Sequence, residues 1–99
     1  MLHTVNKSPF EKNSLESCLA YATKGSTILL IEDGVYAAVQ NTAVADTLKK
    51  AMADFTICAL EPDLKARGVR AKVMDGIKLV DYSGFVDLVV ENDKVQAWL

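Results

Sequence analysis

The two cysteines, Cys18 and Cys58, are the side chains in this sequence with the most versatile chemistry. A thiolate attacks sulfur and binds metals, but an apolar setting raises the thiol pKa and suppresses both reactions. Cys58 lies within the apolar stretch "FTICAL" and is expected to fill the core. Cys18 shares a helical face with Leu15, Leu19 and Ala22, which favours a packed thiol. A reactive Cys18 would require this helix to lie at a subunit interface.

Acidic residues follow three of the expected strands: Glu32 and Asp33, then Glu61, then Asp81. The carboxyl ends of parallel strands meet at one edge of a sheet, where paired carboxylates could bind Mg²⁺ or serve as acid and base. Asp after a strand is, however, more often a turn or N-cap residue. We therefore expect structural roles for these four side chains.

Other signs of catalysis are weak. His3 is the only histidine, and no nucleophile or orienting partner stands beside it in the sequence, so a structural role is expected. The five glycines do not cluster, and neither a dinucleotide fingerprint nor a P-loop is present. Nucleotide binding is therefore disfavoured. The cysteines have no metal-ligand spacing, and no metal or organic cofactor is expected.

Short apolar runs alternate with helical patterns along the chain. Asn13 is the expected N-cap of the first helix, although Ser8-Pro9-Phe10-Glu11 could begin it earlier, and Gly25 ends it. In the last expected helix Phe85, Leu88 and Val89 share a face. The expected strands are 1–5, 26–32, 54–61, 76–82 and 94–99, and the expected helices are 13–24, 42–53, 61–68 and 83–92. This order predicts an α/β fold, a three-layer α/β/α arrangement around a small, mostly parallel sheet of four to five strands.

Composition sets the class of protein. The 99 residues fit one domain, 1–99, and the hydrophobic content of 51% is slightly high, which indicates a fully covered sheet or a subunit interface. A net charge of −2 gives no nucleic-acid-binding footprint. The stretch "MLHTVNKSPF" has neither a basic n-region nor a long apolar stretch, so no signal peptide is expected, and no apolar run reaches membrane length. The cysteines are expected to be reduced thiols of a cytoplasmic protein.

Several stretches together resemble one family. "MLHTVNKSPFE", "LLIEDGVYAAV", "DLKARG", "DYSGFVDLV" and the final "QAWL" are similar to the DsrH/TusB family of sulfur-relay subunits, in family order and across essentially the whole chain. The resemblance implies the DsrE/DsrF/DsrH-like fold. It also implies a cytoplasmic hetero-hexamer with DsrE/TusD-type and DsrF/TusC-type subunits, two copies of each. This complex would pass persulfide sulfur to a DsrC/TusE-type carrier, without direct nucleic-acid or membrane contact.

The resemblance carries over to few residues. The catalytic cysteine of the relay lies in the DsrE/TusD-type subunit, so a non-catalytic role is expected for this chain. Dsr-branch H subunits carry a first-helix cysteine in a context like "NSLESCL", which Cys18 matches, whereas Tus-branch relatives commonly lack it. The resemblance is therefore closer to DsrH, with sulfur oxidation as the expected process and 2-thiolation of tRNA wobble uridine as the alternative. Cys18 is therefore a candidate relay cysteine, and a Cys18 packed in the core is the alternative.

Interface residues are a separate prediction from the pattern. Asp33, Gly34, Val35 and Tyr36 follow the second strand and are expected to present small apolar groups and an aromatic ring to a partner. Trp98 would be ordered by docking either on a partner or on its own sheet. Two further alternatives are a purely structural adaptor and a free-standing sulfurtransferase that uses Cys18.

Overall fold

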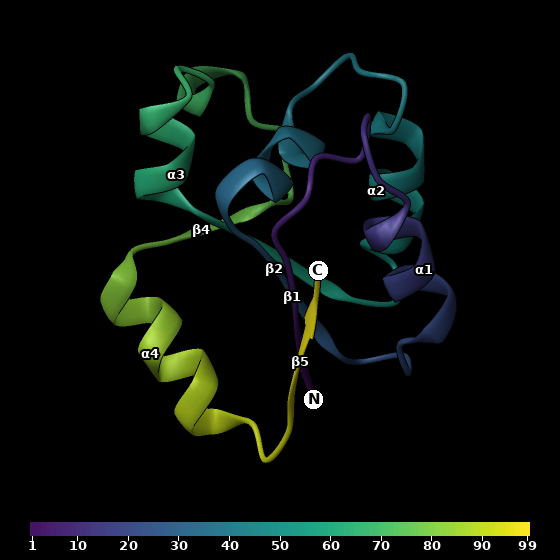
Figure 1. The fold of residues 1–99 in the computed structure, drawn as a ribbon, viewed down its shortest axis with the longest axis vertical. Coiled ribbons are helices and arrows are strands. Elements are labelled where there is room, and N and C mark those ends of the chain that lie inside the picture. Colours follow the sequence, from purple (N-terminus) through teal and green to yellow (C-terminus); the bar gives the residue numbers. More distant parts are fainter.

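The computed structural model describes residues 1–99 and has a parallel sheet at its centre (Figure 1). The strands are β1 (Leu2–Val5), β2 (Thr27–Leu30), β3 (Thr56–Leu60), β4 (Lys78–Val80) and β5 (Val95–Trp98). The α-helices are α1 (Ser14–Tyr21), α2 (Ala45–Ala51), α3 (Glu61–Ala66) and α4 (Tyr82–Glu91), and the 3₁₀-helices are η1 (Glu32–Ala38) and η2 (Arg70–Lys72). The α/β fold predicted from the sequence is confirmed.

The strand order, β4-β3-β2-β1-β5, decides which helices cover which face. All four strand pairs are parallel, so every connection is a crossover, and crossovers are right-handed. The steps from β1 to β2, β3 and β4 run in one direction and place their helices on one face. The step from β4 back to β5 runs in the opposite direction and places α4 alone on the other face.

The core follows this asymmetry. A cluster of 16 buried residues, among them Cys18, Leu48 and Leu64, lies under the helices of the first three crossovers. On the α4 face the buried cluster has only three members, Leu2, Leu29 and Cys58, covered by side chains that include Phe85 and Leu88. The two layers of helix around the sheet are therefore very unequal.

The element ends differ from the sequence prediction in three places. Ser8 closes a turn instead of starting a helix, because its carbonyl accepts from the backbone N–H groups of Glu11 and Lys12. The second strand ends at Leu30, since Glu32 takes a positive φ of 49° and the chain turns into η1. Val89, predicted to share the buried face of α4, is 41% exposed.

Candidate functional site

Both thiols are buried, on opposite faces of the sheet. Cys18 in α1 has no exposed surface, and burial raises the pKa of its thiol to about 11. Cys58 in β3 is equally inaccessible; burial raises its pKa too, and the nearby charge of Lys78 offsets this only in part. Neither thiol has the electropositive, partly exposed surroundings that reactive cysteines need.

Of the four acidic residues at the strand ends, Asp33 and Glu61 form ion pairs, whereas Glu32 accepts a hydrogen bond from the Asn6 side-chain amide at 3.3 Å. The Asp33 carboxylate accepts from Arg67 Nε at 2.9 Å, and Glu61 accepts from Arg70 Nε at 3.0 Å. The hydrogen bond from Arg70 is the main reason why the pKa of Glu61 lies below its ordinary value. The structure contains no group of three or more His, Cys, Asp or Glu side chains placed to hold a metal ion. The carboxylates brought together here tie α3 and η2 to their neighbours.

Asp81 has a different role, as the N-cap of α4. Its Oδ1 accepts the backbone N–H of Gly84 at 2.7 Å, which satisfies one of the free donors at the helix start. We expect Asp81→Ala to lower the free energy of unfolding by about 1 kcal/mol, and Asp81→Asn to keep most of the stability. Urea denaturation of the two variants measures this difference. Equal stability of Asp81→Ala and wild type would contradict the capping role.

His3, Tyr21 and Trp98 form an aromatic cluster that joins β1, α1 and β5. Trp98 Nε1 donates to His3 Nδ1 at 3.1 Å, and the Tyr21 and Trp98 rings meet edge to face with centroids 5.6 Å apart. In the structure Trp98 packs on the sheet of its own chain, which is one of the two predicted alternatives. His3 is fully buried, and its Nε2 has no hydrogen-bond partner.

The His3–Trp98 bond predicts a pH-dependent stability. Nδ1 accepts from Trp98, so it carries no proton, and burial, followed by the N-terminal charge, lowers the pKa of His3 below 6.5. A lowered histidine pKa means that its contribution to stability is complete above pH ~6.5 and is lost as the pH falls below that value. We expect Tm to fall between pH 7.5 and 5.5 and His3→Leu to flatten this slope. A wild-type slope that persists in His3→Leu would refute the assignment.

The predicted interface segment 33–36 is partly buried. Gly34 and Val35 are buried by the chain itself, so they are not the exposed apolar groups that were expected, and their contact with a partner stays a prediction. They turn inward because η1 packs back over the ends of the strands. Asp33 is exposed and Tyr36 half-buried, and their contact with a partner stays a prediction.

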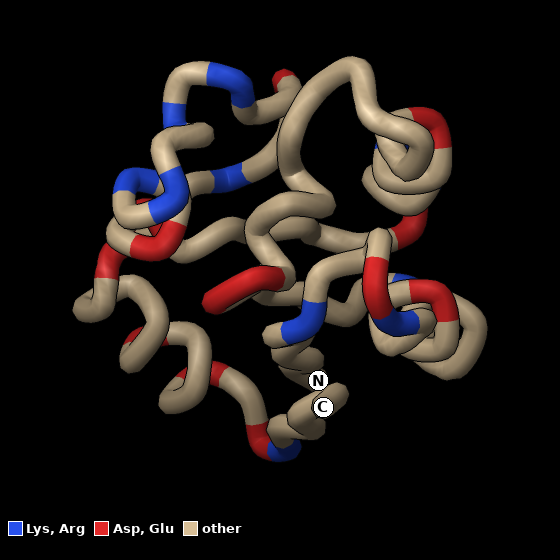
Figure 2. The backbone as a smooth tube through the Cα atoms, turned by 45° about the horizontal axis from the view of Figure 1, so that its top comes forward, with Lys and Arg blue, Asp and Glu red and all other residues tan.

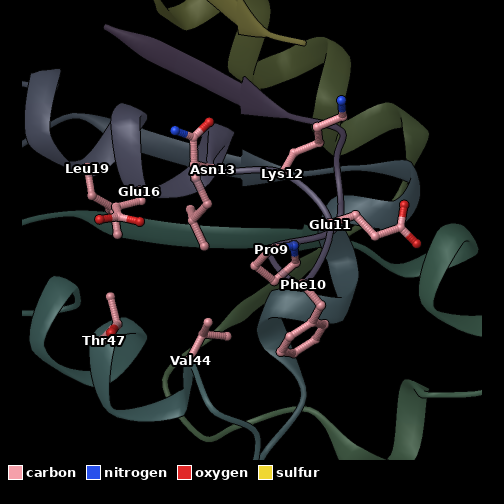
Figure 3. Close-up of a pocket in the computed structure, with 10 residues that line it drawn as sticks. Pro9, Phe10, Glu11, Lys12, Asn13, Glu16, Leu19, Val44 and Thr47 are labelled. Atoms are coloured by element: carbon pink, nitrogen blue, oxygen red, sulfur yellow. The ribbon is translucent and has the colours of Figure 1, made fainter.

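A pocket of about 390 Å³ lies between the loop before α1 and the start of α2 (Figure 3). Phe10, which is 54% exposed, and Val44 lie on its wall, with Leu15 and Leu19 of α1. This pocket was not predicted from the sequence. The sequence feature that could have indicated it is Pro9-Phe10 in a short turn, because such a turn seldom buries a large aromatic ring completely.

Comparisons with known proteins identify the class. A family model described as "DsrH like protein" matches residues 7–95. "Protein TusB" of Erwinia tasmaniensis is 37% identical over 98 residues, 99% of this chain and 100% of the relative, and "Protein TusB" of Escherichia coli K12 is 36% identical with the same coverage. The chain therefore belongs to the DsrH family, as its sequence predicted, and is a sulfur-relay subunit.

Solved structures agree on the fold. The crystal structure of the ychN protein from E. coli superposes with a TM-score of 0.78 over 97% of each chain, at 14% identity. MTH1491 from Methanobacterium thermoautotrophicum superposes with a TM-score of 0.75 over 97% of this chain and 96% of that one, at 12% identity.

None of the helices combines the length and the apolar character that a membrane span requires.

Proposed function

We propose that this chain is a non-catalytic subunit of a cytoplasmic sulfur-relay complex. Its partners are DsrE/TusD-type and DsrF/TusC-type subunits, two copies of each, and the complex hands persulfide sulfur to a DsrC/TusE-type carrier. The observation that carries the proposal is the complete burial of both cysteines in a member of a sulfur-relay family. In a relay step one thiolate attacks the outer sulfur of another residue's persulfide, the S–S bond of that persulfide breaks, and the donor residue leaves as a thiolate. The step needs an accessible thiolate.

The proposal gives Cys18 a packing role. Its pKa of about 11 leaves almost no thiolate at neutral pH, and it lies among the core residues under α1. The transfer thiols would then belong to the sister subunits and the carrier. This chain would complete the shape of the assembly.

The final acceptor in this proposal is the wobble uridine of tRNA, which receives sulfur as 2-thiouridine. The curated relatives at 34–37% identity that support it carry the name TusB. A second candidate is oxidation of stored sulfur, favoured by the match of Cys18 to the first-helix cysteine of Dsr-branch subunits. In both candidates the subunit has the same place in the relay.

A deletion strain of the native host tests this function. Loss of the gene is expected to remove 2-thiouridine from bulk tRNA, measured by nucleoside mass spectrometry, and plasmid-borne wild type and Cys18→Ala are both expected to restore it. Unchanged 2-thiouridine in the deletion strain, with impaired oxidation of sulfur, would support the second candidate. Restoration by wild type but not by a well-folded Cys18→Ala would make Cys18 a relay residue.

A further inference from the structure

The uncovered apolar surface of α4 follows from the topology. A helix about 10 Å wide spans about two strands at a spacing of ~4.8 Å, so α4 alone cannot cover a face of five strands. Its inward side chains Phe85 and Leu88 cover the cluster over β1, β2 and β3. On edge strand β5, Val95 and Ala97 remain exposed; Val95 pairs in register with Leu2, so it lies on the α4 side of the sheet.

The helix itself carries an exposed apolar stripe, the α4 stripe, which runs beside its buried face. Its members recur at helical spacing, so they line one side of the helix. They are Tyr82 (61% exposed), Val86 (61%), Val89 (41%) and Val90 (79%). Single exposed valines are ordinary, but four large apolar side chains on one helix are typical of a surface that binds another protein.

Acidic side chains stand next to this stripe. Residues 79–93 contain four acids, Asp81, Asp87, Glu91 and Asp93, and two lysines, Lys78 and Lys94, flank the segment. Lys78 pairs in register with Cys58, so it lies on the α4 side of the sheet, at its β4 edge. None of the four acids makes an ion pair within the chain. Figure 2 shows the acidic positions of α4 away from the basic positions of α3 and η2. The α4 stripe is therefore apolar, and acids outnumber bases four to two along its border.

The charge decides between possible occupants. An anionic membrane or a nucleic acid would be repelled by the acids. A second copy docked through α4 about a two-fold axis would bring acidic borders together, since such a contact pairs the same patch with itself. A partner surface with aliphatic side chains bordered by Lys and Arg would match both the apolar stripe and the acidic residues beside it.

We propose that the α4 stripe, with Val95 and Ala97 of β5, is the surface through which this chain binds a different protein subunit that presents an aliphatic patch bordered by basic residues. The inference rests on the proposed function, because the subunit is one of the two sister subunits of the relay complex. The partner completes the cover of the sheet face that α4 leaves open.

The test uses the full chain, tagged and co-expressed with the DsrE/TusD-type and DsrF/TusC-type proteins of its host. Val86→Glu/Val90→Glu places charge in the stripe, and Asp87→Lys/Glu91→Lys reverses the border. The valine variant is expected to reduce recovery of sister subunits at least about tenfold, as for central interface residues. The border variant is expected to reduce it less, and most at low salt, because rim charges act mainly on the association rate. Phe10→Glu is the matched control, because Phe10 is about as exposed as Val86 but lies near α1 and α2, on the opposite face of the sheet from α4. This variant should recover both subunits. Circular dichroism and Tm confirm that each variant is folded.

The outcomes separate the two claims. Failure of wild type to recover either sister subunit would contradict the proposed function. Recovery by wild type and equal recovery by the folded valine variant would overturn the α4 surface and leave the proposed function standing. A wild-type dimer in sedimentation velocity that the valine variant abolishes would assign the surface to a second copy and overturn the inference.

Discussion

Iodoacetamide will modify Cys18 of the folded protein about 300-fold more slowly at pH 7.5 than it modifies a free cysteine. The factor is the ratio of thiolate fractions for a pKa of about 11 against an ordinary ~8.5. Full burial of the side chain slows the reaction further. Peptide mass spectrometry after timed quenching follows Cys18 and Cys58 separately.

Unfolded protein in urea is the control for this experiment, because both thiols then react at the ordinary rate. The rate at Cys18 in the folded protein should also rise with pH up to at least 10. A rate that levels off by about pH 9.5, as for an ordinary thiol pKa of ~8.5, or a rate close to that in urea, would mean an accessible thiol with an ordinary pKa. The packing role of Cys18 would then be wrong.

Gly34→Ala is expected to cost about 3 kcal/mol of folding free energy or to prevent folding. A Cβ at Gly34 would collide with the backbone carbonyl oxygen of Val5 and lie 2.9 Å from its carbonyl carbon. That same oxygen accepts the backbone N–H of Ile31 at 3.0 Å, so the end of β1 cannot move without loss of this bond. Urea denaturation measures the loss.

Gly68→Ala is the control for this prediction, because it introduces backbone strain at a positive φ without a steric collision. Gly68 has a φ of 69° and open space where a Cβ would stand. Its substitution should cost only about 1–2 kcal/mol, the usual penalty for alanine in the left-handed region. A Gly34→Ala variant as stable as Gly68→Ala would contradict the close approach of η1 to β1.

Local patterns predicted much of this fold because they depend on neighbours in the chain. The helix face of Leu15 and Cys18, and the strand at Thr56–Leu60 that holds Cys58, follow from spacing alone. The 3₁₀-helix at Glu32–Ala38 did not, because Glu32, Asp33 and Gly34 after the apolar run have the composition of a surface turn, and nothing in the sequence indicates the positive φ at Glu32. Its buried Gly34 and Val35 were consequently mistaken for surface residues.

Contacts between distant parts of the chain were beyond the sequence pattern. The bond from Trp98 to His3 joins residues 95 positions apart, and it depends on β5 pairing with β1. The open face at α4 likewise follows from the strand order and not from any local motif. Exposure of Val86 and Val90 could be predicted only once the single reversed crossover was known.

We expect the thiols of this chain to take no part in the sulfur relay to which it belongs. Native mass spectrometry of the co-expressed complex, followed by denaturing analysis after loading with a persulfide donor, tests this expectation directly. We expect an assembly with two copies of each of three subunits, a mass increase of one sulfur, about 32 Da, on the DsrE/TusD-type subunit, and none on this chain. An assembly in which this chain gains the sulfur, and Cys18→Ala loses it, would contradict this expectation.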